Sequence, residues 1–122
     1  MRKLAALSVL ASLPSSLLAT PYDGVYRQAA NAECALVGVD GAAIAIRDGI
    51  FYGVDAECRM VGPVNVVDMD ATLYTMECTG EGAVWSERAM IMHTAERDGV
   101  FLIWNGYAFR YDRCPENEGD AE

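Results

Sequence analysis

Short alternating runs of apolar and polar residues, separated by turn-forming pairs, cover most of the chain beyond residue 20. Asp-Gly or Asn-Gly pairs occur at residues 23–24, 40–41, 48–49, 98–99 and 105–106. The runs between them are rich in Val, Ile, Tyr, Phe, Trp and Thr, which favour strands over helices. This rhythm predicts an all-β antiparallel protein of six to eight strands.

The clearest hairpin is expected between Val100 and Tyr111. Its Asn105-Gly106 pair readily adopts the two positive φ angles of a type I′ turn, and such a turn determines the strand register. One face of the hairpin is then wholly apolar or aromatic, and we expect it to lie in the core. Its predicted cross-strand pairs are Trp104 with Tyr107, Leu102 with Phe109, and Val100 with Tyr111.

The opposite face of this hairpin pairs Ile103 with Ala108 and Phe101 with Arg110. If no other segment covers it, it is an apolar patch with a charged edge, which suits a protein partner. The alternative is that another segment covers it as part of the core. Trp85 has the same two interpretations, as a binding anchor or as a core residue. The candidate partner-binding residues are therefore Trp85, Phe101, Ile103 and Arg110.

Five further segments have the composition and alternation of strands, and one short segment suggests a helix. The expected strands are Tyr22–Arg27, Ala43–Ile46, Ile50–Val54, Ala71–Cys78 and Val84–His93. The expected helix is Gln28–Leu36, capped by Asn31. Pro63 should lie in a connection or at a sheet edge, because it cannot donate to a ladder. A flat sheet of this size would expose an apolar face, so we expect a small antiparallel, partly closed barrel or a sandwich.

The first nineteen residues have the layout of a secretory signal peptide. Arg2 and Lys3 precede an apolar run of ten residues, Leu4 to Leu13, and cleavage is expected after Ala19. We expect a single β domain over residues 20–114 and a disordered acidic tail over 115–122. Location in the periplasm or the secreted fraction follows, without a membrane anchor after cleavage. Cleavage removes two basic residues and no acidic one, which changes the formal net charge from −9 to −11.

Four cysteines in a small exported domain predict two disulfides. A zinc site is not expected, because the chain has no closely spaced cysteine pair to present two thiolates to one ion. Three pairings are open. We favour Cys34 with Cys58 and Cys78 with Cys114, since neighbouring hairpins would bring those ends together.

The strong acidity of the chain narrows the class of partner. Eighteen acidic residues stand against nine Lys and Arg in 122 residues, enough for one small domain. Such a charge disfavours nucleic acids and anionic membrane surfaces, which both attract basic faces. It would instead steer a basic protein toward the chain.

No motif in the sequence points to catalysis, a metal or a cofactor. His93 is the only histidine, and a lone histidine at a strand end is more often structural than catalytic. The acidic pairs Asp68/Asp70 and Asp55/Glu57 would each share a face of an extended chain. They could in principle serve acid/base chemistry or calcium binding, but a role in solubility is the simpler interpretation.

The overall layout of the chain supports a resemblance. With a signal peptide, four cysteines, a β-rich body and a closing Tyr111-Asp112-Arg113-Cys114 segment, it resembles small exported proteins of unknown function from Gram-negative bacteria. It is also distantly similar in build to periplasmic inhibitors of lysozyme or of secreted proteases, which are small disulfide-bonded β-barrels. The Ser-Gly-x-x-Tyr loop of those lysozyme inhibitors is missing, so the resemblance implies no inhibitory residue.

Taken together, these features lead us to expect a non-enzymatic exported domain that binds a protein partner, with inhibition of a hydrolase as one form of that activity. A structural or assembly factor of the cell envelope is the alternative. An enzyme that uses a carboxylate pair is a third hypothesis. It would require two acids that face each other in a concave site.

Overall fold

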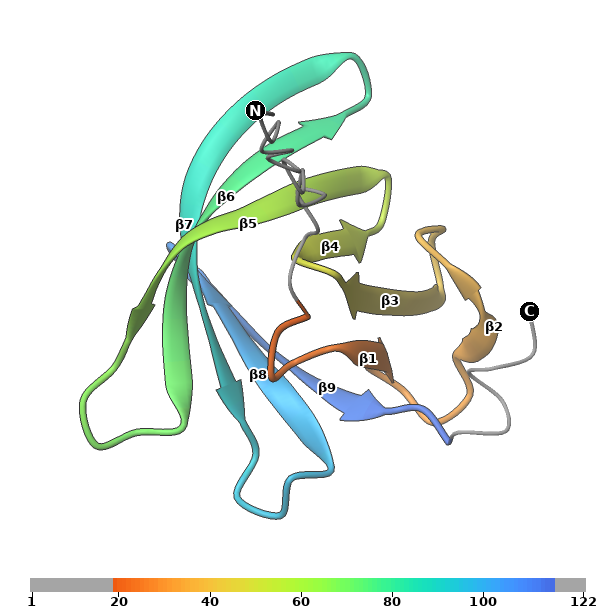
Figure 1. Cartoon of the computed structure of the whole chain (residues 1–122). Coiled ribbons are helices and arrows are strands. Elements are labelled where there is room, and N and C mark those ends of the chain that lie inside the picture. Colours follow the sequence, from red (N-terminus) through yellow and green to blue (C-terminus); the bar gives the residue numbers. More distant parts are fainter. Residues whose placement is uncertain (1–18, 116–122) are drawn as a thin grey trace, which may run out of the picture.

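Turn residues divide the chain into nine strands in the computed structural model, which describes residues 19–115 (Figure 1). Within these residues, five non-glycine positions adopt positive φ angles, among them Asp48 and Glu81 in the tight turns of hairpins. The strands are β1 (Gly24–Arg27), β2 (Glu33–Val37), β3 (Ala42–Arg47), β4 (Ile50–Gly53), β5 (Ala56–Asn65), β6 (Ala71–Gly80), β7 (Ala83–His93), β8 (Gly99–Trp104) and β9 (Tyr107–Arg113).

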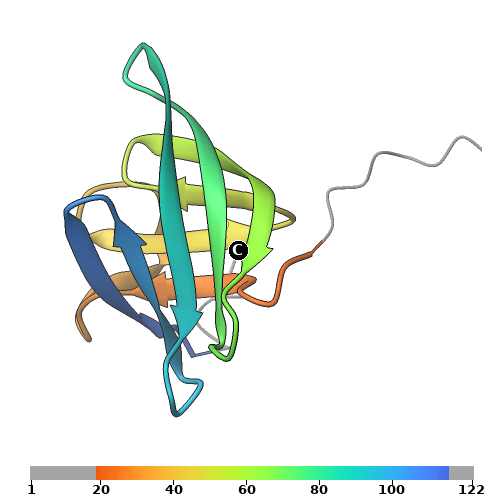
Figure 2. The ribbon, with the colours of Figure 1, turned by 90° about the vertical axis from the view of Figure 1, so that its left-hand side faces the viewer.

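The strands form a closed eight-stranded antiparallel barrel with one additional strand. From β3 to β9, each strand pairs with the next in sequence, and β1 closes the barrel by pairing with both β9 and β3. The additional strand, β2, pairs with β3 in parallel. Figure 2 shows the curled sheet from the side, with the β6–β7 hairpin extending beyond the other strands at one end. The all-β prediction is confirmed, and full closure selects the barrel over the sandwich.

The β8–β9 hairpin has the register that its Asn-Gly turn predicts. The five pairs expected from Val100↔Tyr111 to Trp104↔Tyr107 are all present. Val100 and Leu102 are fully buried, and Trp104 packs against the core. The prediction of a wholly buried face was wrong at Tyr107, which directly follows the turn and is 67% exposed.

All five further strands expected from the sequence are present, with bounds that differ by a few residues. The helix expected over Gln28–Leu36 was wrong, since residues 28–32 are turns and bends and β2 follows them. No helix occurs within residues 19–115, so none of that part of the chain forms a helix long and apolar enough to cross a membrane. Pro63 lies in β5 at a shift of register, beyond the residues of β5 that pair with β4.

Alternation along each strand packs one set of side chains into the barrel. On β6, Thr72, Tyr74, Met76 and Cys78 are all buried, as their common face predicts. Tyr22 lies just before β1 and is 1% exposed. Its hydroxyl is 2.9 Å from that of Thr72, and its backbone carbonyl accepts a 2.6 Å hydrogen bond from the Tyr26 hydroxyl. Large side chains therefore pack the interior, as a barrel of eight strands requires.

The cysteines form two disulfides, Cys34–Cys114 and Cys58–Cys78. The favoured pairing of Cys34 with Cys58 and Cys78 with Cys114 was therefore wrong. Cys58 and Cys78 lie directly opposite each other on neighbouring strands β5 and β6. Barrel closure brings the end of β9 beside β1, and the amide of Cys114 donates a hydrogen bond of 2.8 Å to the Val25 carbonyl. At that position Cys114 is close enough to β2 to bond with Cys34. Two disulfides indicate an oxidising, non-cytoplasmic environment.

Two expectations concern segments that the structure does not describe. The signal peptide falls on residues 1–18, with only Ala19 of its nineteen residues inside the described range. The acidic tail falls on residues 116–122, with only Pro115 described.

Candidate functional site

A row of apolar side chains crosses the outer face of four adjacent barrel strands. Leu73 on β6 lies opposite Met90 on β7, Met90 lies opposite Ile103 on β8, and Ile103 lies opposite Ala108 on β9. Leu73 and Met90 lie between buried neighbours along their strands, and Ile103 follows the buried Leu102, so these side chains point away from the core, and Ala108 is paired with Ile103 on the same face. Leu73, Met90 and Ile103 are only partly covered in the described part of the chain.

A second row on the same face widens the apolar area. Met92 lies opposite Phe101, and Phe101 lies opposite Arg110. The Arg110 guanidinium carbon is 5.7 Å from the centre of the Phe101 ring, a distance that fits a cation–π contact. We refer to the two rows together as the outer apolar face. It consists of Leu73, Met90, Met92, Phe101, Ile103 and Ala108.

Two arginines border the outer apolar face. Arg110 donates to Asp112 at 3.1 Å and to Asp98 at 3.5 Å. The hydrogen bond to Asp112 raises the pKa of Arg110, with Asp98 and Glu96 adding to the effect. Arg88 is exposed and has no ion-pair partner within residues 19–115. The guanidinium of Arg110 is therefore held by acidic neighbours, whereas the guanidinium of Arg88 is open to a carboxylate of another molecule.

Three of the four residues that the sequence singled out for partner binding are brought together on this face. Phe101, Ile103 and Arg110 are neighbours in the β8–β9 register. Trp85 is not part of the same face, because it lies an odd number of residues from Met90 along β7. It is 36% exposed near the tip of the β6–β7 hairpin, and its indole nitrogen donates to Glu87 at 2.8 Å. Of the two interpretations of Trp85, placement in the core therefore does not hold.

A groove of about 750 Å³ runs beside the outer apolar face at the point where β8 ends. Strand β7 continues past that point, since Ala89 is its last residue paired with β8, whereas β7 itself begins at Ala83. The groove combines apolar side chains from three strands with polar groups from the part of β7 that continues past β8. Its lining includes Leu73, Ser86, Arg88, Met90, Ile103 and Asn105.

This groove was not predicted from the sequence. One signal of it was present, because the expected strand Val84–His93 is about twice as long as the stretch from Val100 to the Asn-Gly turn. A long strand paired with a short one must leave part of one edge without a neighbour.

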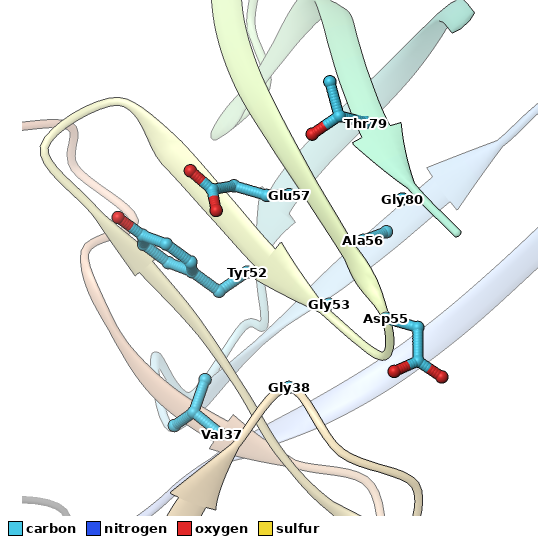
Figure 3. Close-up of a pocket in the computed structure, with 9 residues that line it drawn as sticks. All are labelled: Val37, Gly38, Tyr52, Gly53, Asp55, Ala56, Glu57, Thr79 and Gly80. Atoms are coloured by element: carbon cyan, nitrogen blue, oxygen red, sulfur yellow. The ribbon is translucent and has the colours of Figure 1, made fainter. Parts of the chain in front are cut away.

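The acidic pairs do not form facing carboxylates. Asp55 has a φ of 52° and lies in the turn between β4 and β5, so the alternation of an extended chain does not apply to it. Figure 3 shows it pointing away from Glu57 at a hollow of about 330 Å³. Asp68 also has a positive φ, and Asp70 forms an ion pair with Arg97. Within residues 19–115, no group of three or more His, Cys, Asp or Glu side chains could hold a metal ion.

His93 is buried at the end of β7 and 8% exposed. Burial lowers its pKa, Arg97 and Arg113 lower it further, and Asp70 and the backbone of Pro21 partly offset the change. Neither ring nitrogen has a hydrogen-bond partner of normal geometry within the described part of the chain. All four cysteines are in disulfides, so no free thiol is available as a nucleophile.

Comparisons with known proteins add no family to this description. No protein-family model matches the chain, and no match is found among curated proteins or solved structures.

Proposed function

We propose that the protein is a non-enzymatic, exported domain of the periplasm or the secreted fraction that binds a protein partner through the outer apolar face. The observation that carries this proposal is the row Leu73–Met90–Ile103, which is in register across three strands and only partly covered. Interfaces commonly have an apolar centre and a polar rim, and here Arg88 and Arg110 supply part of such a rim. The interior is packed with side chains, so binding is expected on the outside.

The charge of the chain favours a basic partner. The formal charge is −9 for the full sequence and −11 once residues 1–19 are removed. A charge of this size accelerates the approach of a cationic protein and makes the association rate fall with added salt. A basic hydrolase such as lysozyme fits these requirements, and its inhibition is the specific form of the activity that we propose.

The proposal can be tested by titrating micromolar protein into lysozyme at low and at physiological salt, with binding and lytic activity as readouts. We expect binding with inhibition at low salt and weaker binding at higher salt. Absence of binding at low salt would reject lysozyme as the target. A replacement of Ile103 by Asp should abolish the interaction, because it places a charge in the centre of the apolar row.

A matched control distinguishes this surface effect from a change in net charge. Val67 lies between β5 and β6, is 83% exposed, and is not part of the outer apolar face. The Val67→Asp variant adds the same charge and should bind as the wild type does. Equal losses of binding affinity in Ile103→Asp and Val67→Asp would show that the outer apolar face is not the binding surface.

A further inference from the structure

Strand β7 has an open edge over its first half. Its pairing with β8 runs from His93↔Val100 to Ala89↔Trp104, whereas its pairing with β6 continues to Ala83↔Gly80. Residues 84–88 therefore have a neighbouring strand on one side only, within the part of the chain that the structure describes. Figure 2 shows this segment in the hairpin that extends beyond the other strands.

The register determines which backbone groups point to this open edge. Only Glu81 and Gly82 separate β6 from β7, so the closing pair Gly80↔Ala83 of this two-residue turn is hydrogen-bonded across the hairpin. Hydrogen-bonded and non-hydrogen-bonded pairs alternate along an antiparallel ladder. The N–H and C=O groups of Val84 and Ser86 therefore point away from β6, toward the side where β8 is absent.

The space beside this edge can accept a further strand. The groove of about 750 Å³ lies there, and Ser86, Arg88 and Asn105 contribute to its lining. The side chains on the open segment are also free to contact an added strand, since Val84 is 81% exposed and Trp85 is 36% exposed. Exposed apolar side chains on an open strand edge form a template for strand addition.

We propose that residues 84–88 of β7 bind an extended segment of a basic protein partner, which adds to the barrel as an antiparallel or parallel strand in place of the missing part of β8. This inference rests on the proposed function and specifies its binding mode. Main-chain hydrogen bonds to Val84 and Ser86 hold the segment, and the groove accepts its alternate side chains.

Charge identifies the occupant as a basic segment rather than a second copy of this chain. Glu81 precedes the open segment and Glu87 lies in it, which outweighs the single cation there, Arg88, and the chain after cleavage carries −11. A second copy would bring the same charges to the same edge, and the two would repel each other. In a segment that alternates basic and apolar residues, the arginine or lysine side chains would instead lie near Glu87, and the apolar side chains would lie in the groove.

The test uses an eight-residue peptide of alternating valine and arginine as the probe, with amide hydrogen exchange followed by NMR. Binding should slow exchange of the Val84 and Ser86 amides at least tenfold and leave that of Trp85 and Glu87 unchanged, because those two already face β6. A peptide of the same sequence with N-methyl groups on one backbone edge retains the side chains and the charge. It should bind at least tenfold more weakly.

A variant of the protein provides the reciprocal test. Ser86→Pro removes the outward N–H without breaking a hydrogen bond to β6, so the variant should keep its circular dichroism spectrum and lose at least tenfold in peptide affinity. Ser86→Thr keeps the N–H and should bind like the wild type.

Three results would overturn the inference: no binding of the peptide, equal binding of the N-methylated peptide, or a concentration-dependent dimer that Ser86→Pro abolishes. If lysozyme binding is lost in Ile103→Asp but unchanged in Ser86→Pro, the proposed function stands and strand addition fails. If the peptide binds at the edge while Ile103→Asp leaves protein binding intact, the outer apolar face fails instead.

Discussion

The His93 imidazole stacks on the Tyr22 ring, with ring centroids 4.6 Å apart and ring planes inclined by 29°. Tyr22 in turn meets the Tyr74 ring edge-on at 6.4 Å. His93 thus helps to anchor the segment before β1 against the barrel. Because both imidazole nitrogens are without a hydrogen-bond partner of normal geometry in the described chain, a proton on this ring would bring a charge into a buried site whose cost Asp70 only partly offsets.

This arrangement predicts that the protein loses stability in weak acid. Burial lowers the pKa of His93 below its ordinary value of 6.5, so the unfolded chain binds a proton more readily than the folded one. The contribution of the neutral, buried His93 to the free energy of unfolding is therefore complete above pH 6.5 and decreases as the pH falls below that value. The free energy of unfolding in urea, measured at pH 8 and pH 5, should fall more for the wild type than for His93→Phe. An equal fall would contradict this role of His93.

The disulfide pairing can be checked directly by peptide mapping under non-reducing conditions. Trypsin cleaves after arginine, and the described chain contains no lysine. Each cysteine therefore falls in a different tryptic peptide. Mass spectrometry should find the peptide 28–47 joined to the peptide that begins at Cys114, and 48–59 joined to 60–88. A species that joins 28–47 to 48–59 would contradict the pairing.

The two disulfides should differ in what they contribute to stability. Their partners are separated by 80 residues in Cys34–Cys114 and by 20 residues in Cys58–Cys78. The chain-entropy model then gives a loss of about 4.5 kcal/mol for removal of the first and about 3.3 kcal/mol for removal of the second. Urea denaturation of the two paired Cys→Ser variants should reproduce that order. The reverse order would show that native contacts, and not loop closure, dominate.

Two neighbouring residues of β8 should respond very differently to truncation. Leu102 is fully buried inside the barrel, whereas Ile103 belongs to the outer apolar face. Leu102→Ala should cost about 2–5 kcal/mol of unfolding free energy, because it leaves a cavity. Ile103→Ala should cost less than about 1 kcal/mol. Similar losses in calorimetry or urea denaturation would mean that the outer apolar face is covered in the free protein.

The strands and hairpins were predictable where the information is local. The β8–β9 register follows from Asn105-Gly106 alone, because a two-residue turn leaves no freedom in how its strands align. The expected helix over Gln28–Leu36 failed for the opposite reason. A short segment has little intrinsic helical stability, and pairing of β2 with β3 supplies backbone hydrogen bonds that a brief helix could not match.

The candidate site was only half predictable. Alternation placed Phe101, Ile103 and Arg110 on one face, but whether another segment covers that face depends on contacts between distant strands. The open edge of β7 likewise appears only when the lengths of paired strands are compared. Trp85 illustrates the limit, since its apolar character favours the core while its place near a projecting tip leaves it 36% exposed.

By itself, the sequence determined the all-β class, the turns, the alternation of buried and exposed residues and the presence of four cysteines in a chain with an export-like start. These properties depend on interactions between residues close in the chain. Only the tertiary structure decided the closure of β1 on β3 and β9, the partners of each cysteine and the exposure of the outer apolar face. Those features join residues that are 80 or more positions apart at Cys34–Cys114 and at the β1–β9 pairing, and no local preference specifies which distant strands meet.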